Sequence, residues 1–137
     1  MNQNDRARGV LLGTAAGDAL GAGYEFTYPT ADTAIDMIGG GPFDWAPGEW
    51  TDDTSMALCV ARALADGSGL DGIAAQFVAW YDTDPADIGN QTRLVLSHRS
   101  ASASEMTAVA SSLTGRTGGN GSLMRTAPCL LYTSDAA

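Results

Sequence analysis

Residues 52–65 carry the clearest structural signal in this chain, because their hydrophobic side chains recur at the spacing of an α-helix. Met56, Val60 and Leu64 lie one turn apart and share one face, with alanines on either side. Gly67 follows where a helix commonly ends in a left-handed glycine. No segment shows the alternation of polar and apolar residues that is typical of a strand. The sequence therefore predicts an all-α fold.

Further helices are predicted around this one. Their periodic segments are residues 6–16, 71–81, 88–98 and 104–111. The glycine-rich residues 17–23 are expected to loosen the backbone after the first helix, and Ser122 is a candidate N-cap of another helix through Met124. Residues 27–50 contain several Gly and Pro and predict a long loop, although its aromatic residues argue against disorder. Short helices packed at angles, in a compact orthogonal bundle, are the expected architecture.

The acidity of the chain limits its partners. The 137 residues suit one domain, and 16 Asp and Glu face 7 cationic residues, all arginine, for a formal net charge of −9. Such a chain lacks the basic surface that nucleic acids or anionic membranes require. Clustered carboxylates suit hard divalent cations, but they can also serve only to keep a surface soluble.

The cysteines and the N-terminus bear on the compartment. Cys59 and Cys129 are far apart in sequence and do not suggest a disulfide framework, which favours a reducing cytoplasm. Arginines followed by an apolar run resemble the start of a signal peptide, but Asp18 interrupts the run. No segment reaches the length of a membrane span. We therefore expect a soluble cytoplasmic protein.

The sequence Thr51-Asp52-Asp53-Thr54 stands directly before the predicted 52–65 helix and has two interpretations. A threonine or aspartate N-cap, followed by an acidic residue in the first turn, is ordinary helix-start chemistry. A single helix needs only one cap, however, and adjacent ionised aspartates repel each other. A hydroxyl and two carboxylates form an all-oxygen set that suits Mg²⁺, Mn²⁺ or Ca²⁺ rather than zinc.

Four motifs together resemble a known family. The order is GDALG with a following Glu (residues 17–25), GEWTDDT (48–54), DIGNQT (87–92) and GNGSLMR (119–125). This order is similar to that of the ADP-ribosylglycohydrolases, including the dinitrogenase-reductase-activating glycohydrolase type. The resemblance extends along nearly the whole chain.

The resemblance implies an all-α fold with a dinuclear Mg²⁺ or Mn²⁺ centre in a cleft. It places Thr51, Asp52 and Asp53 in the N-terminal half of that centre. It also places Glu25 near the metals, as a metal-linked carboxylate or general base, and Asp87 at a catalytic position. The alternatives without a catalytic role are a solvated Glu25 and an Asp87 that caps a helix beginning at Ile88. The implied reaction hydrolyses the bond between ADP-ribose and a protein side chain or a related ADP-ribosyl substrate, through a transition state with oxocarbenium character.

Several other residues are candidates for binding or for structure. The predicted substrate-binding residues are Asn90, Gly119, Asn120, Gly121 and Ser122. Glycines and a helix N-terminus favour the binding of a pyrophosphate or ribose there, although a Gly-Asn-Gly turn often has no binding role. Arg125 is expected to pair with a phosphate or an internal carboxylate, and Asp18 to hold backbone amides in place. His98 is expected to be structural or surface-exposed, and Trp45 and Trp50 are expected to pack in the core more than to wall the cleft.

The resemblance covers about the first half of the family's domain. Residues 1–137 are therefore predicted to be the N-terminal portion of a single domain, because the family's second metal motif lies downstream. The final TSDAA is interpreted as a truncation or sequence artefact. An exposed apolar surface and an inactive isolated fragment are expected, whereas the full-length parent is expected to be an enzyme. A non-catalytic module that binds ADP-ribose or metal, and a purely structural helical piece, are the alternatives.

Overall fold

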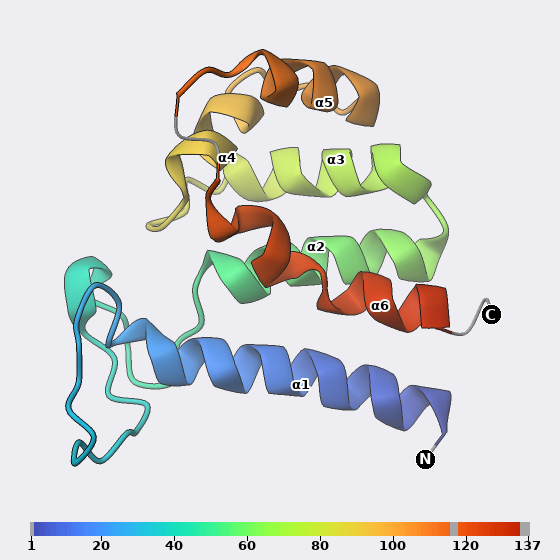
Figure 1. Ribbon diagram of the computed structural model, residues 1–137. Coiled ribbons are helices and arrows are strands. Elements are labelled where there is room, and N and C mark those ends of the chain that lie inside the picture. The colour runs from blue at the N-terminus through green and yellow to red at the C-terminus, as the bar shows by residue number, and fades with distance from the viewer. Residues whose placement is uncertain (1, 116–117, 135–137) are drawn as a thin grey trace.

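The computed structural model describes residues 2–115 and 118–134, and over these residues the fold is helical (Figure 1). The α-helices are α1 (Gln3–Ala22), α2 (Asp52–Asp66), α3 (Gly69–Tyr81), α4 (Asn90–Leu96), α5 (Ala103–Ser112) and α6 (Ala127–Ser134). Two 3₁₀ turns, η1 (Gly41–Phe43) and η2 (Asn120–Arg125), accompany them. No strand occurs among the described residues, in which an isolated bridge joins Gly40 and Trp45. The prediction of an all-α fold is confirmed.

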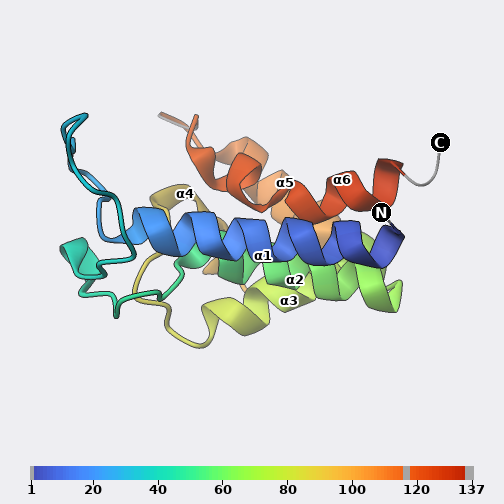
Figure 2. The same cartoon turned by 90° about the horizontal axis from the view of Figure 1, so that it is seen from below.

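Helix α2 is the centre of the fold. It packs against α1, α3, α6 and η2, while α5 packs against α3 and α4. Figure 1 shows α1, α2 and α3 stacked one above another, and Figure 2 shows that α6 runs beside α1. The core cluster consists of Met56 on α2, which is fully buried, and of the buried Ile88 and Leu96, and side chains of α3 pack against it. Because α2 is surrounded, its N-terminal end is held firmly in the molecule.

Helix α1 extends well beyond its predicted end. The glycine-rich residues 17–23 are expected to loosen the backbone, but the helix continues to Ala22. Glycine weakens an isolated helix by about 1 kcal/mol per residue relative to alanine. Here α1 packs along α2 and α6, and Asp18 is bound to the start of α2 by hydrogen bonds. Tertiary contacts therefore outweigh the local preference.

The 88–98 prediction is correct in type but too long at both ends. Helix α4 begins after the cap residue Gly89 and ends at Leu96. Ile88 is buried in the core rather than helical, so Asp87 does not cap this helix. Arg99 has a left-handed φ of 50° just beyond the last turn. The burial of Ile88 before α4 and the left-handed backbone of Arg99 after it thus define where this helix begins and ends.

Large hydrophobic side chains remain exposed on several elements. They include Leu12 on α1, Leu70 on α3, Leu123 on η2 and Leu130 on α6, which are 69%, 73%, 72% and 65% exposed. Exposed apolar side chains, as expected, thus occur on these four elements. Over the described residues, no helix combines the length and the apolar character that a membrane crossing needs. Residues 135–137 of the TSDAA tail lie outside the described residues.

Candidate active site

Asp18 ties α1 to the first turn of α2. Its Oδ2 accepts hydrogen bonds from the backbone N–H groups of Thr51 (3.0 Å) and Thr54 (2.9 Å). The Thr54 hydroxyl donates to the same oxygen at 2.6 Å, and the Thr51 hydroxyl donates to Oδ1 at 2.8 Å. An anion at a helix N-terminus is stabilised by the free N–H groups there. The expectation that Asp18 holds backbone amides in place is confirmed.

Thr51 is the N-cap of α2 and also the centre of an oxygen cluster. Its Oγ1 accepts a hydrogen bond from Asp53 N at 3.3 Å. The same Oγ1 lies 3.5 Å from Asp52 Oδ1 and 3.5 Å from Asp53 Oδ2. Because one hydroxyl has one hydrogen, it can satisfy only one carboxylate, and the shortest contact is to Asp18. Capping and oxygen clustering therefore coexist at this helix start.

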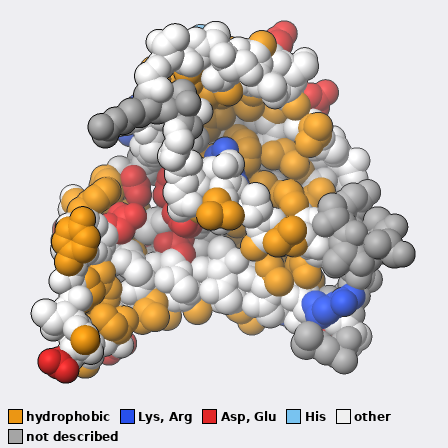
Figure 3. All heavy atoms as spheres, viewed as in Figure 1, with side chains coloured by type: hydrophobic (Ala, Val, Ile, Leu, Met, Phe, Trp, Pro, Cys, Tyr) orange, Lys and Arg blue, Asp and Glu red, His pale blue; other side chains and the backbone are white. Residues whose placement is uncertain are grey.

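One cavity gathers most of the predicted site residues, and we call it the main cavity. Its volume is about 700 Å³, within the roughly 300–1,000 Å³ typical of small-molecule sites. The predicted residues that line it are Glu25, Asp52, Asp53, Asp87, Asn90, Gly119, Asn120, Gly121 and Ser122. Figure 3 shows acidic side chains gathered in a hollow of this face, next to a hollow lined by hydrophobic side chains. Segments distant in sequence thus meet around one space.

Burial and crowding raise the pKa of the acids around this cavity. The pKa of Asp52 rises to about 7, because burial disfavours its charge and Asp87 and Asp53 repel it. Burial also raises the pKa of Glu25, with repulsion from Asp87 next in importance. The Asp53 and Asp87 carboxyls have raised pKa values, and burial is again the largest cause. Such shifted acids, sharing one cavity, are typical of functional sites.

Glu25 follows the end of α1 in a turn rather than in open solvent. Its Oε2 is buried and has no hydrogen-bond partner among the described residues. The neighbouring Phe26 has a left-handed φ of 59°, is 82% exposed, and also borders the main cavity. A buried carboxylate oxygen without a donor is costly unless a cation or ligand satisfies it. This observation argues against a merely solvated Glu25.

The segment before α6 also lines the main cavity. Ser122 lies inside the 3₁₀ turn η2, whose cap residue is Gly119, so the predicted N-cap role of Ser122 is wrong. A Cβ at Gly119 would meet no atom within 4 Å, whereas one at Gly121 would lie 3.3 Å from Thr92 Oγ1. The backbone at Gly119 therefore faces open space, where a ligand can approach it closely.

Arg125 lies in the wall of the main cavity, in contact with apolar groups. Its guanidinium carbon is 4.8 Å from the centre of the Phe77 ring, and Nη1 is 3.0 Å from Met56 Sδ. Burial lowers its pKa, while the charge of Asp52 opposes that shift. No ion pair between Arg125 and a carboxylate occurs among the described residues. The expected pairing with an internal carboxylate is therefore not observed.

A second cavity, of about 590 Å³, adjoins the main cavity. We call it the tryptophan pocket, because Trp45, Trp50 and Trp80 all line it. Trp50 is 46% exposed, so the expectation that it packs in the core is wrong. Sequence reasoning did not single out Trp80. Its position three residues after Phe77 on α3 was the signal that could have found it.

The oxygen-rich donor set partly fits a hard divalent cation. Thr51 Oγ1 lies 3.5 Å from one carboxylate oxygen of Asp52 and 3.5 Å from one of Asp53, and Glu25 has a buried oxygen without a hydrogen-bond donor. These are ligand types that Mg²⁺ and Mn²⁺ prefer. In residues 2–115 and 118–134, however, no group of three His, Cys, Asp or Glu is arranged as a complete site. The described residues thus provide oxygens of the right type but no complete metal site.

The fold and the acid-lined cavity define an all-α protein with a carboxylate-rich, small-molecule-sized site. The family profile for ADP-ribosylglycohydrolase matches residues 1–137. The chain therefore belongs to the ADP-ribosylglycohydrolase family.

Named relatives agree with this assignment. ADP-ribosylarginine hydrolase Tri1 of Pseudomonas putida (strain GB-1) is 41% identical over 93% of this chain and 36% of its own length. ADP-ribosyl-[dinitrogen reductase] glycohydrolase of Rhodospirillum rubrum is 42% identical over 66% of this chain and 33% of its own length. A solved structure, an ADP-ribosylglycohydrolase-related protein complex, matches with a TM-score of 0.70 and 38% identity, over 93% of this chain and 42% of that one. The chain thus spans only about a third to two fifths of these relatives.

Proposed function

We propose that the complete protein containing this chain is a hydrolase that releases ADP-ribose from a modified side chain, with ADP-ribosyl-arginine as its substrate. The observation that carries the proposal is the convergence of Glu25, Asp52, Asp53 and Asp87 on one cavity that faces the Gly119–Ser122 turn. Family membership supports the reaction class. The names of the relatives in Pseudomonas putida and Rhodospirillum rubrum support an ADP-ribosylated substrate.

The cavity has two walls of different chemistry, and each suits one part of ADP-ribose. The exposed backbone around Gly119 offers N–H groups to the pyrophosphate or the adjacent ribose. The acidic wall offers negative charge where the ribose carbon C1″ becomes positive during bond cleavage. We therefore place the diphosphate toward η2 and the scissile bond toward Asp52 and Asp87.

Hydrolysis of the glycosidic bond needs a general base that activates water and a leaving group that keeps the bonding electrons. The oxygen of water bonds to C1″ as the bond from C1″ to the acceptor nitrogen breaks. The electron pair of that bond stays on the nitrogen, which takes up the proton that water releases, so that one water molecule is consumed. Glu25 or Asp87 accepts the proton from water, and burial raises the pKa of both carboxyls, which makes each carboxylate a stronger base than a solvated one.

We also propose that Thr51, Asp52 and Asp53 hold a hard divalent cation, Mg²⁺ or Mn²⁺, in the complete protein. A bound cation would orient substrate hydroxyls or water and would offset the repulsion between the carboxylates. The crowded oxygens of these residues and the buried, unpartnered oxygen of Glu25 support this proposal. Helix capping by Thr51 is compatible with it, because capping uses only one lone pair of the hydroxyl.

A non-catalytic module that binds ADP-ribose or metal is the second candidate. It is compatible with the same acid-lined main cavity, which can bind a ligand without cleaving it. The two candidates predict the same binding but different chemistry. Only the hydrolase converts ADP-ribosyl-arginine into free ADP-ribose and arginine.

The test uses the complete protein, incubated with an ADP-ribosyl-arginine peptide and Mg²⁺ or Mn²⁺. Chromatographic detection of free ADP-ribose, abolished by Asp87→Asn, supports the hydrolase. ADP-ribose binding without release supports the binding module. Failure to bind ADP-ribose and failure to release it would together refute both proposals.

Metal binding has its own readout, independent of turnover. Mn²⁺ affinity is measured by electron paramagnetic resonance for wild type, Asp52→Asn and Asp53→Asn. The control is Asp32→Asn, which removes an exposed carboxylate from the 27–50 loop. We expect each site variant to bind Mn²⁺ at least tenfold more weakly and the control to bind it normally. Equal affinities across the four proteins would overturn the metal assignment.

A further inference from the structure

All three tryptophans of the chain line the tryptophan pocket, although they come from distant parts of the sequence. Trp45 and Trp50 belong to the loop before α2, and Trp80 belongs to the last turn of α3. The carboxylates of Glu49, Asp52 and Asp87 line the same space. Among the described residues that line it, none is basic. The pocket therefore combines aromatic faces with negative charge.

The tryptophan pocket and the main cavity share Asp52 and Asp87. A bond that crosses the junction between the cavities would thus pass these two carboxylates. The two sides differ in character, because the Gly119–Ser122 turn lines only the main cavity and Glu49 lines only the tryptophan pocket. A substrate made of two chemically different halves, joined by the scissile bond, fits this arrangement.

We infer that the tryptophan pocket binds the cationic acceptor side chain, an arginine guanidinium, while ADP-ribose occupies the main cavity. This inference rests on the proposed function and adds to it the residues that select the acceptor. Indole faces attract cations more strongly than other aromatic side chains do. A guanidinium is planar and weakly hydrated, so it stacks on aromatic rings more readily than an ammonium group does. A neutral serine acceptor would gain little from either feature.

The walls of the pocket are held in place before any ligand binds. Trp45 pairs with Gly40 through two backbone hydrogen bonds of 2.7 and 2.9 Å, and its ring centre lies 5.8 Å from that of Phe43. Glu49 Oε2 accepts a hydrogen bond from Ala46 N at 2.7 Å. These contacts fix one indole and one carboxylate. A preorganised wall loses little conformational entropy when a ligand binds.

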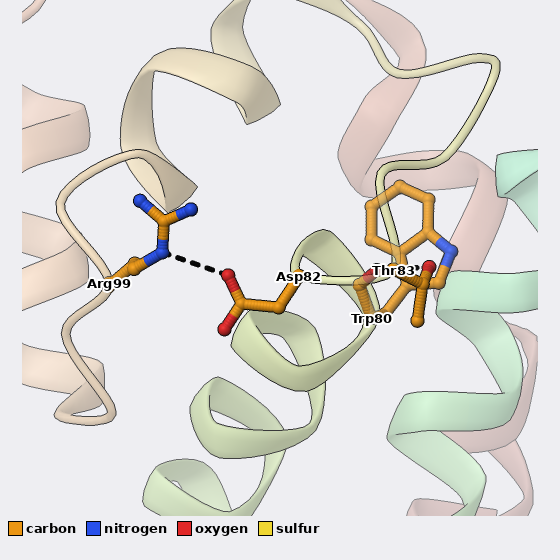
Figure 4. Close-up of polar contacts among 4 residues, drawn as sticks. All are labelled: Trp80, Asp82, Thr83 and Arg99. Carbon is orange, nitrogen blue, oxygen red and sulfur yellow. Dashed lines mark hydrogen bonds and ion pairs between the residues drawn. The ribbon is translucent and has the colours of Figure 1, made fainter.

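Trp80 is fixed from the other side. It packs against the core cluster around Met56, and its backbone oxygen accepts a 2.6 Å hydrogen bond from the Thr83 hydroxyl. Figure 4 shows Trp80 and Thr83 together on one side of the turn after α3. On the other side, Asp82 Oδ1 pairs with Arg99 Nε at 2.8 Å. Trp50, which is 46% exposed, leaves its ring accessible to a ligand.

The direct test is calorimetric binding of two small probes to the complete protein. N-acetyl-arginine methylamide carries the guanidinium, and the citrulline analogue has the same shape without the charge. We expect the arginine probe to bind at least fivefold more tightly. We expect Trp50→Ala to weaken its binding by about 2- to 30-fold, the range of cation–π contributions. Glu49→Gln, a milder change at the rim, should weaken it less, and Tyr28→Ala, a 98% exposed aromatic of the same loop, should have no effect.

The outcomes separate this inference from the proposed function. Equal binding of both probes, or no binding of either, overturns the assignment of the pocket even if ADP-ribose is released. If Trp50→Ala weakens the binding of free ADP-ribose as much as that of the arginine probe, the effect is a general loss of structure. In that case the Glu49→Gln variant provides the test. If this variant prefers the arginine probe over the citrulline probe as strongly as wild type does, the inference is refuted. Selective binding of arginine without any ADP-ribose release supports the pocket and refutes the hydrolase proposal.

Discussion

Replacing Asp18 by alanine tests how the start of α2 is held. The change removes the acceptor for the backbone N–H groups of Thr51 and Thr54, which are only 3% and 2% exposed. Each buried donor left without a partner costs about 1–3 kcal/mol, so the two together cost about 2–6 kcal/mol. A cavity borders Asp18, so water can partly satisfy these N–H groups. The expected loss in the free energy of unfolding is therefore about 2–3 kcal/mol.

The assay is urea unfolding followed by circular dichroism, at neutral pH and with EDTA present. The matched control is Asp5→Ala, an exposed acidic residue in the first turn of the same helix. Asp5→Ala should lower the free energy of unfolding by less than about 1 kcal/mol, because this variant loses only an interaction with the helix dipole. Asp18→Asn should lie between the two, since the amide oxygen can still accept the bonds now made by Oδ2. If Asp18→Ala costs no more than Asp5→Ala, the hydrogen-bond reasoning is wrong.

Three further predictions concern charge, core and loop. The pKa of Asp52 is raised from 3.8 to about 7 in the folded state, so the folded protein binds this proton more tightly than the unfolded chain does. Stability in EDTA should therefore fall as the pH rises through this window, and a Tm that rises there in calorimetry would contradict the shift. Met56→Ala should cost about 2–5 kcal/mol in urea unfolding, far more than Leu12→Ala at a site that is 69% exposed. Gly39→Ala should lower the Tm and alter the fluorescence of Trp45, because its Cβ would clash with Trp45 O at a φ of +64°. An unchanged emission spectrum would contradict this clash.

The sequence predicted the elements whose signals are local. Helix α2 was found with its start at Asp52, because a threonine cap, an acidic first turn and a regular apolar stripe all agree there. The order of four motifs also predicted the family correctly. Helix α5, Ala103–Ser112, agrees with the predicted 104–111 within one residue at each end.

Predictions failed where the deciding contact was distant in sequence. The glycines of α1 weaken a helix on local grounds, but Asp18 binds residues 33 and 36 positions away. The cap roles given to Asp87 and Ser122 failed because Ile88 is buried in the core and η2 is a 3₁₀ turn. Local propensities amount to tenths of a kcal/mol per residue, so burial and buried hydrogen bonds override them.

The sequence by itself determined which side chains this protein has for its chemistry: paired aspartates after a threonine, a glycine-rich turn and a helical framework. Only the tertiary structure decided which of them share a space. It placed Glu25 and Asp87 beside Asp52, raised the pKa values of these acids, and brought Trp80 to Trp45 and Trp50. The physical reason is that electrostatic repulsion and burial depend on distance in space, which sequence separation does not report.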